Sequence, residues 1–431
     1  MSSFIVYFTE NIDYSVCMPI CGLRLSINIY QEMYNKSKKL TRRIFMWFYH
    51  WVLRLLKIYI ILFLMPIAVL WSWAGVGSTD AALLDETIRV AIVKSAQEVT
   101  VSGEGLLVTG DKDEAVVLNL PVTVRLTKDG LVADGKQMRR LVFSATSALY
   151  INNKPYRGLA ELSRTDNGIL VVNQLSLEDY LVGLINCEIS SAWPIEAVKA
   201  QAVIARTYAL SRKASRANAS YHLESSVIDQ VYEGCLIEDS RARRAVSETE
   251  HEVLTYGGSI IQAFYHSSCG GKTEASENVW GSALPYLKGV ECQYCQTSQT
   301  ATLWEQKLSL VDIEERLRTA GYKISGVTGI KIGPSNSRGR LKQVVIVAAK
   351  GGVSLTGDQF RKAVGYGVIK STRFTVKIAD GDVRFTGSGN GHGVGLCQWG
   401  AKQRALDGFN YSEILSYYYP GTELMKMSGS R

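Results

Sequence analysis

The sequence predicts an α+β fold, in which a β-rich segment precedes a larger part that mixes helices with strands. Between Ile88 and about Val172, apolar residues alternate with polar ones or form short β-branched runs, whereas helical spacing begins at Ser176. At 431 residues the chain is long enough for two or three domains, and its 46% hydrophobic residues can supply substantial cores.

The N-terminus predicts a basic segment, 1–57, followed by a membrane-spanning or signal segment, 58–79. Residues 1–57 hold eight Lys/Arg and three Asp/Glu, and the next 22 residues carry no charge. About 20 apolar residues cross a bilayer, and basic residues before the span keep the N-terminus in the cytoplasm. We therefore expect export to the cell envelope. Anchor and cleaved signal both remain open, and with Met46 as an alternative start residues 1–45 would be mis-assigned.

Residues 86–167 are predicted to form a β-rich lead subdomain that serves as a scaffold. Strand-like runs are separated by the turn sequences Lys128-Asp-Gly, Ala133-Asp-Gly and Asp166-Asn-Gly. This segment holds no cluster of catalytic residue types.

Helices are predicted from Ser176 onward. Ser176-Leu-Glu-Asp179 is typical of a capping box, and helical spacing continues to about Glu188. Pro194 suits the first turn of a second, Ala-rich helix that reaches about Lys213. Because this helix is apolar on two sides, we expect it to be central and buried. Later elements are a helix over 240–252, strands over 259–265, 342–349 and 373–378, a Gly-rich loop over 387–395 and a final helix near 397–408.

The formal charge of +8 does not by itself indicate nucleic-acid binding. Residues 1–57 carry +5 of it, so residues 58–431 keep only +3. A nearly neutral body lacks the basic surface expected of a protein that binds phosphate backbones, and we expect no nucleic-acid partner.

Two charged residues stand among apolar neighbours. Glu188 lies where the first helix should end, and is either the structural partner of a base or a general acid whose pKa burial has raised. Arg206, near the middle of the buried helix, either pairs with an acid or binds an anionic ligand. Spacing alone favours the structural salt bridge.

The Gly-rich loop contains His392 and is followed by Gln398 and Trp399. It lacks the Lys-Ser/Thr of a P-loop and the acid of a dinucleotide site, so it does not predict phosphate binding. Glycine allows close approach of a ligand or another strand. The polar and aromatic groups suit a sugar, and a core role for His392 is the alternative.

Two pairs of soft ligands, His266-x2-Cys269 and Cys292-x2-Cys295, resemble a Cys3His zinc site. In an exported protein, disulfides are the alternative, with Cys187, Cys235 and Cys397 also available. Free buried thiols are the third possibility, and all three interpretations remain open.

Three blocks of sequence resemble the family of stage II sporulation protein D and the amidase enhancer LytB (the SpoIID/LytB family). They comprise Val172–Leu210, Ala263–Thr273 with Pro285-Tyr-Leu, and Gly391–Ala401 with Ile414–Thr422. The resemblance covers about 168–425 and implies a SpoIID-like catalytic domain there.

The family includes lytic transglycosylases that cut MurNAc–GlcNAc bonds in glycan strands already freed of stem peptides. Its catalytic Glu aligns with Glu188, and a single acid/base carboxyl would suffice to give 1,6-anhydroMurNAc ends, whereas hydrolysis usually needs a second acid. The resemblance also implies a structural zinc ion, in agreement with the His/Cys pairs. It places four residues in the cleft as substrate-binding groups: Arg206, Tyr208, His392 and Gln398.

The resemblance leaves a second function open, that of a non-catalytic glycan-binding or amidase-enhancing module. In both cases the expected partners are peptidoglycan glycan strands, the membrane through the N-terminal segment, and other cell-wall hydrolases.

Overall fold

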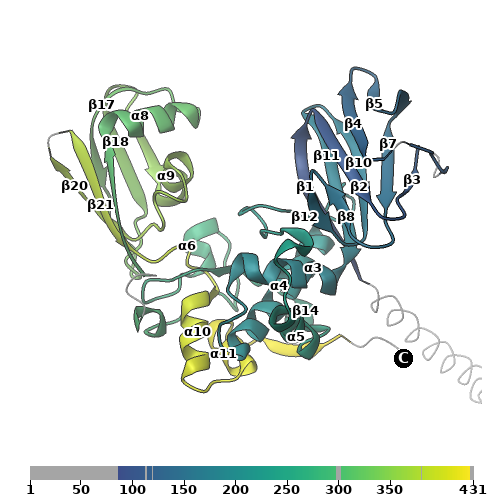
Figure 1. Cartoon of the computed structure of the whole chain (residues 1–431). Helices are drawn as coiled ribbons and strands as arrows, with labels where there is room; N and C mark the ends of the chain where they lie inside the picture. Colours follow the sequence, from purple (N-terminus) through teal and green to yellow (C-terminus); the bar gives the residue numbers. More distant parts are fainter. Residues whose placement is uncertain (1–85, 112–113, 119, 298–301, 380, 428–431) are drawn as a thin grey trace, which may run out of the picture. The chain divides into compact units, whose positions relative to one another are not determined.

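The computed structural model describes residues 86–111, 114–118, 120–297, 302–379 and 381–427, which belong to one compact unit, Asp80–Arg431 (Figure 1). The basic segment 1–57 and the apolar segment 58–79 lie outside the described residues. Within the described ranges, no helix combines the length and the apolar character needed to cross a bilayer. The membrane-spanning or signal segment therefore remains a prediction.

The lead part of the chain consists of two six-stranded sheets, ordered β12-β1-β11-β10-β7-β3 and β6-β5-β4-β2-β8-β9. Alternating side chains such as Val99 and Val101 are fully buried in one apolar core that both sheets share. The strands are β1 (Thr87–Ala96), β2 (Glu98–Gly103), β3 (Leu107–Thr109), β4 (Val122–Thr127), β5 (Gly130–Ala133), β6 (Lys136–Met138), β7 (Arg140–Ser144), β8 (Leu149–Ile151), β9 (Lys154–Tyr156), β10 (Leu159–Thr165), β11 (Gly168–Ser176) and β12 (Leu223–Glu224).

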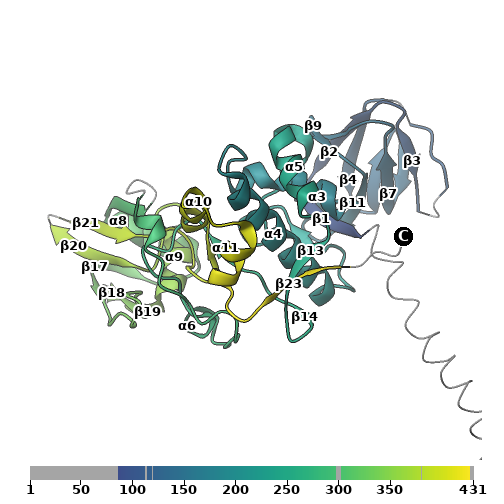
Figure 2. The same cartoon turned by 90° about the horizontal axis from the view of Figure 1, so that it is seen from below.

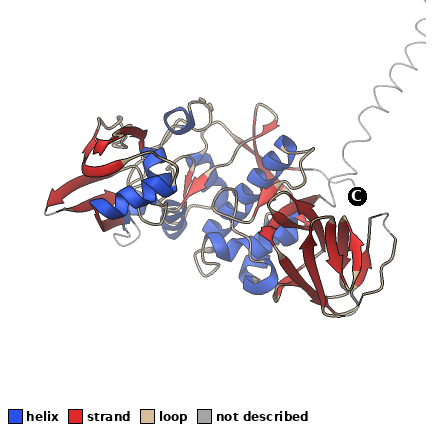
Figure 3. Ribbon diagram, turned by 90° about the horizontal axis from the view of Figure 1, so that it is seen from above, coloured by secondary structure: helices blue, strands red, loops and turns tan. Residues whose placement is uncertain are grey.

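The expected domain boundary at 167 falls inside a β-hairpin of this part. β11 pairs antiparallel with β10 from Thr165↔Gly168 onward, and its other edge pairs with β1. The lead sheet therefore runs without interruption into the first helix. Figure 3 shows this part of the chain drawn in strands and loops.

The first helix, α3 (Leu177–Glu188), begins and ends where the sequence predicts. Ser176 caps it, because its hydroxyl accepts a hydrogen bond from the Asp179 N–H at 3.2 Å. The helix ends after Glu188 because Ile189 adopts an extended backbone.

The second helix, α4 (Ile195–Ser215), is the buried helix expected from its two apolar sides. It contacts α3, α5 (Ser240–Glu248), α10 (Gln398–Leu406) and α11 (Tyr411–Tyr418), and Figure 2 shows α10 and α11 beside it. Contacts on several sides explain why most of its residues are buried.

Residues 302–388 have an apolar core of their own, and we call them the inserted module. Two three-stranded sheets, β16-β21-β20 and β17-β18-β19, pack with two helices around Phe360, Phe374 and Phe385. The strands predicted over 342–349 and 373–378 correspond to β18 and β20. The elements are β16 (Leu303–Ser309), α8 (Leu310–Thr319), β17 (Ser325–Ile332), β18 (Gln343–Lys350), β19 (Val353–Thr356), α9 (Gly357–Val364), β20 (Phe374–Ala379) and β21 (Asp382–Ser388).

The inserted module is strongly basic. It contains 15 Lys/Arg and seven Asp/Glu, a formal charge of +8. The nearly neutral charge of residues 58–431 is thus an average over a basic module and an acidic remainder. The charge argument against a nucleic-acid partner does not extend to this module.

Short strands bring distant blocks of sequence together around α4. β15 (Tyr265–His266) pairs in parallel with β22 (Leu396–Cys397), and β13 (Glu252–Tyr256) lies between β14 (Ser259–Ile260) and β23 (Glu423–Lys426). The remaining short elements are η3 (Gly234–Ile237), α6 (Ser276–Trp280) and η4 (Tyr294–Thr297). The β15–β22 pair places the middle block of the sequence beside the last one.

Candidate active site

Glu188 lies half-buried at the C-terminal end of α3, where its carboxyl accepts a hydrogen bond from the Val231 N–H at 3.3 Å. Burial raises the pKa of Glu188 to about 7, because desolvation penalises the charged form. Hydrogen bonding by the Tyr265 hydroxyl, the Val231 N–H and the Gln398 amide partly opposes this effect. A carboxyl with a pKa near neutrality can both donate and accept a proton, as a general acid/base must.

Tyr265 connects Glu188 to a buried chain of hydrogen bonds. The Tyr180 hydroxyl donates to Gln230 Oε1 at 3.0 Å, and Gln230 Nε2 donates to the Tyr265 hydroxyl at 3.2 Å. Since the Tyr265 hydroxyl accepts from Gln230, its own proton is available to the Glu188 carboxyl. We call Tyr180, Gln230 and Tyr265 the hydrogen-bond relay.

Gln398, predicted to bind substrate, lies next to Glu188 at the first position of α10. Its side chain is only 6% exposed, and Nε2 donates to Gln201 Oε1 of α4 at 3.3 Å. Its amide also lowers the pKa of Glu188. The structure thus brings together two residues that are 210 positions apart in the sequence.

His392 lies on the Gly-rich loop, near Tyr265 and an aromatic group. Nδ1 accepts a hydrogen bond from the Val394 N–H at 3.1 Å, and the ring lies 5.1 Å from that of Trp280, which is 44% exposed. Burial, together with the charges of Arg340 and Arg361, lowers the pKa of His392 to about 3. The ring is therefore neutral at pH 7, and its proton resides on Nε2.

Two of the four predicted substrate-binding residues make their polar contacts with acids other than Glu188. Arg206 is 1% exposed, and its guanidinium donates to both carboxylate oxygens of Glu178 at 2.7 Å and to two backbone carbonyls. These contacts form the salt bridge that spacing favoured, and the substrate-binding role that the resemblance implies stays a prediction. The Tyr208 hydroxyl donates to Asp229, a buried carboxylate paired with Arg212 and Arg216.

Four cysteine sulfurs converge beneath the start of α10. The Sγ atoms of Cys269, Cys292, Cys295 and Cys397 all lie within 4.8 Å of one another, and we call them the cysteine cluster. Three of the four predicted zinc ligands are among them, but His266 is not. Its Nδ1 is 3.2 Å from the Val394 carbonyl, on the side of the Gly-rich loop. No disulfide is formed among the described cysteines.

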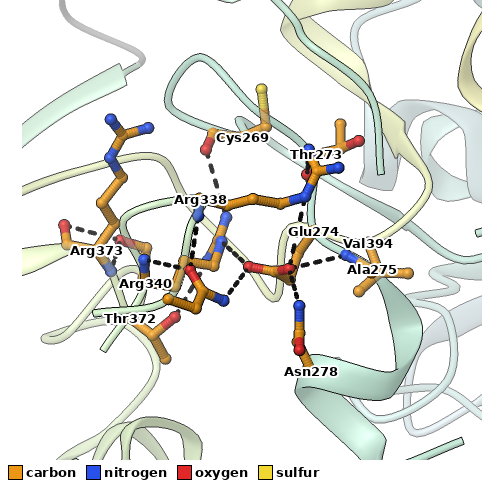
Figure 4. Close-up of polar contacts among 12 residues, drawn as sticks. Cys269, Thr273, Glu274, Ala275, Asn278, Arg338, Arg340, Thr372, Arg373 and Val394 are labelled. Carbon is orange, nitrogen blue, oxygen red and sulfur yellow. Dashed lines mark hydrogen bonds and ion pairs between the residues drawn. The ribbon is translucent and has the colours of Figure 1, made fainter. Parts of the chain in front are cut away.

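A buried carboxylate that sequence reasoning missed, Glu274, joins the inserted module to the site (Figure 4). It is 1% exposed and accepts hydrogen bonds from the side chains of Asn278 at 2.8 Å and Asn336 at 2.7 Å. Arg338 and Arg340 of the module lie 3.9 and 4.0 Å from it.

Arg340 extends this connection to the Gly-rich loop and to Cys269. Its guanidinium, in a side chain only 3% exposed, donates to the carbonyls of Cys269 and Gly391 at 3.4 Å. Gly393 packs directly against it, at a positive φ of 87°. A side chain at that position would clash, which is one physical reason for the Gly-rich loop.

The candidate site of this α+β protein thus centres on a half-buried carboxyl at the end of α3, which receives hydrogen bonds from Tyr265, Val231 and Gln398. Residues 165–256 match the family described as "Stage II sporulation protein", and residues 277–395 match a "Domain of unknown function (DUF8618)" that includes the inserted module.

Three relatives illustrate the similarity. An uncharacterized protein of Brachyspira hyodysenteriae is 34% identical, covering 66% of this chain and 76% of its own. The stage II sporulation protein D of Bacillus amyloliquefaciens is 30% identical, covering 59% and 75%. The amidase enhancer of Bacillus subtilis is 32% identical over 57% of this chain but only 40% of its own length. The chain belongs to the SpoIID/LytB family.

Proposed function

We propose that this chain is a peptidoglycan lytic transglycosylase of the cell envelope, with Glu188 as its one acid/base. The observation that carries the proposal is the half-buried Glu188 carboxyl, whose pKa burial raises to about 7. Among the described residues, no second carboxylate is one of the groups that shift this pKa. A hydrolysing glycosidase normally pairs two carboxyls across the scissile bond.

The proposed reaction needs one proton donor and one proton acceptor in sequence. Protonated Glu188 donates its proton to the glycosidic oxygen as the bond from C1 of MurNAc to that oxygen breaks. The Glu188 carboxylate then takes the proton from the 6-hydroxyl of the same MurNAc, while the oxygen of this 6-hydroxyl attacks C1. The products are a 1,6-anhydro end and a free GlcNAc hydroxyl, no water is consumed, and Glu188 is protonated again.

The neighbours of Glu188 would orient it for both steps. The Tyr265 hydroxyl and the Gln398 amide act on the carboxyl itself, so both are positioning residues. Half-exposed Trp280 offers an aromatic face to the sugar, and the neutral His392 ring lies 5.1 Å from it.

The proposal is tested by incubating the full chain with glycan strands that lack stem peptides. Mass spectrometry of the products should show anhydroMurNAc ends, at a mass one water lower than that of hydrolysed ends. Products with only reducing ends, or no cleavage at all, would overturn the proposal.

A second candidate function, stimulation of an amidase, is favoured by the printed name of the Bacillus subtilis relative. It predicts no anhydro ends from the chain alone, but faster release of stem peptides when the chain is added to a cell-wall amidase. Measuring both products in one experiment separates the two functions.

We also propose that residues 58–79 direct the chain to the cell envelope. Its partners there would be glycan strands and other cell-wall hydrolases. As a cofactor we propose a structural zinc ion. The donor set of the cysteine cluster fits such an ion, because four thiolates are typical ligands of structural zinc. Zinc would stabilise the fold here and take no part in proton transfer.

Tyr265→Phe should lower kcat roughly ten- to hundredfold, because it removes a hydrogen bond to a charged group, which is worth about 1.5–3 kcal/mol. It should also raise the pKa of Glu188, since the Tyr265 hydroxyl lowers it. The alkaline limb of the pH–activity profile then moves to higher pH. Tyr180→Phe, at the far end of the hydrogen-bond relay, is the matched control and should have a smaller effect on both. Equal effects of the two changes would argue against direct positioning.

A further inference from the structure

We propose that Cys397, and not His266, completes a tetrathiolate zinc site, and that this site fixes the start of α10 and thereby places Gln398 beside Glu188. The inference rests on the proposed zinc cofactor and adds its ligand set and its role in the active site.

The cysteine cluster has the geometry that a tetrahedral ion requires. With zinc–sulfur bonds of about 2.3 Å, the sulfurs of such a site lie about 3.8 Å apart. The four Sγ atoms lie within 4.8 Å of one another, each in a side chain that is at most 1% exposed. A disulfide joins only two sulfurs and gives no reason for four to converge.

Three separate segments supply the sulfurs. Cys269 follows β15, Cys292 and Cys295 stand at η4, and Cys397 ends β22. The parallel register pairs His266 with Cys397, so the β15–β22 pair itself carries Cys397 to the other three. His266 faces the Gly-rich loop instead, where Nδ1 meets the Val394 carbonyl.

The surroundings of the sulfurs fit thiolate ligands. The backbone N–H groups of Cys269 and Gly400 donate to Cys397 Sγ at 3.3 and 3.4 Å, and the Tyr418 hydroxyl lies 3.2 Å from Cys292 Sγ. Such donors orient and stabilise metal-bound thiolates from outside the ligand shell. A Cβ at Gly400 would lie 2.8 Å from Cys292 Sγ, so only glycine lets α10 approach the cluster this closely.

The cysteine cluster is linked to the candidate active site through the adjacent residues Cys397 and Gln398. Cys397 is the N-cap of α10, since its sulfur accepts the hydrogen bond from Gly400, and Gln398 is the first residue of that helix. Gln398 in turn contacts Gln201 and acts on Glu188. An ion bound to Cys397 would therefore hold the end of the helix that presents Gln398.

Metal analysis of the full chain, purified without chelator or reductant, tests the ligand set. We expect about one equivalent of zinc in the wild type and in His266→Gln, and a loss of most of it in Cys397→Ser. Cobalt exchange should give the intense near-ultraviolet absorption of cobalt–thiolate bonds. Full zinc content in Cys397→Ser, or a wild type with neither zinc nor titratable thiols, would overturn the proposal.

Amide hydrogen exchange tests the role in the active site without reference to activity. Removal of the metal from the folded wild type should speed exchange at residues 398–401 at least tenfold, with little change in the middle of α4. Unchanged exchange at the start of α10 would contradict the positioning role even if zinc binds. Both measurements stand whether or not the chain cleaves glycan, so they fail independently of the proposed enzymatic function.

Discussion

Glu188→Gln is expected to lower the rate at which anhydro ends form by about 10²–10⁴-fold, the usual contribution of a general acid/base. Gln keeps the shape of the side chain and can accept from the Val231 N–H, but it can neither give a proton to the glycosidic oxygen nor take one from the 6-hydroxyl. The rate is measured by quantifying anhydroMurNAc ends against time at saturating substrate.

A matched control makes this result specific. Glu305→Gln makes the same chemical change on the inserted module, at a carboxylate that is 53% exposed in its side chain and pairs with Arg384. Its rate should equal that of the wild type. If Glu188→Gln retains wild-type activity, Glu188 is not the acid/base.

The pH dependence follows from the direction of the Glu188 pKa shift. The free enzyme must carry the proton to begin the reaction, so kcat/KM should be level below pH 7 and fall tenfold per pH unit above it. With an ordinary carboxyl the fall would begin well below pH 7. A decline that begins near pH 5 would contradict the raised pKa.

The same shift predicts that Glu188 destabilises the fold at neutral pH. The folded-state pKa of Glu188, about 7, exceeds the ordinary value of 4.5, so the folded state binds the proton more tightly. Stability from this group is complete below pH 4.5 and is lost as pH rises to about 7, by at most about 3 kcal/mol. Urea unfolding at pH 5 and pH 8 should show a smaller loss of stability in Glu188→Gln than in the wild type.

Local sequence signals predicted those features that depend on residues close together in the sequence. The Ser176 cap, the helix end at Glu188 and the burial of α4 follow from capping and periodicity, which involve residues close in sequence. Glu188 and Gln398 were predicted as site residues because short motifs contain them. Their contact depends on the packing of α10 against α4, which no local pattern reports.

The structure differs from the sequence-based expectations where the pairing of distant segments decides which side chains meet. The x2 spacing favoured His266 as a ligand, but the β15–β22 register brings Cys397 to the sulfurs instead. Arg206 lies in a matched block, yet its direction is set by Glu178 across the helix pair. Tyr265 stands inside a quoted block, but its role depends on Gln230, from a segment without any motif.

Glu274→Ala should destabilise the chain by about 3–5 kcal/mol, the cost of removing one partner from a buried charge pair. Arg340 would remain in a side chain only 3% exposed, with backbone carbonyls but without the nearby carboxylate. Asn278 and Asn336 would also lose their acceptor. Denaturant unfolding measures the loss, and Glu277→Ala, at an exposed acid three residues further on in α6, should stay within about 0.5 kcal/mol of wild type.

A double change shows whether Arg340 is the group left uncompensated. If it is, Arg340→Met added to Glu274→Ala should cost less than the sum of the two single changes, by roughly 0.5–3 kcal/mol. Simple additivity would mean that Glu274 acts through the asparagines alone. Because Arg340 holds the carbonyls of Cys269 and Gly391, the single change at Glu274 should also loosen the loop that carries His392. The inserted module would then be coupled to the Gly-rich loop through one buried carboxylate, although its fold lies outside every block of the SpoIID resemblance.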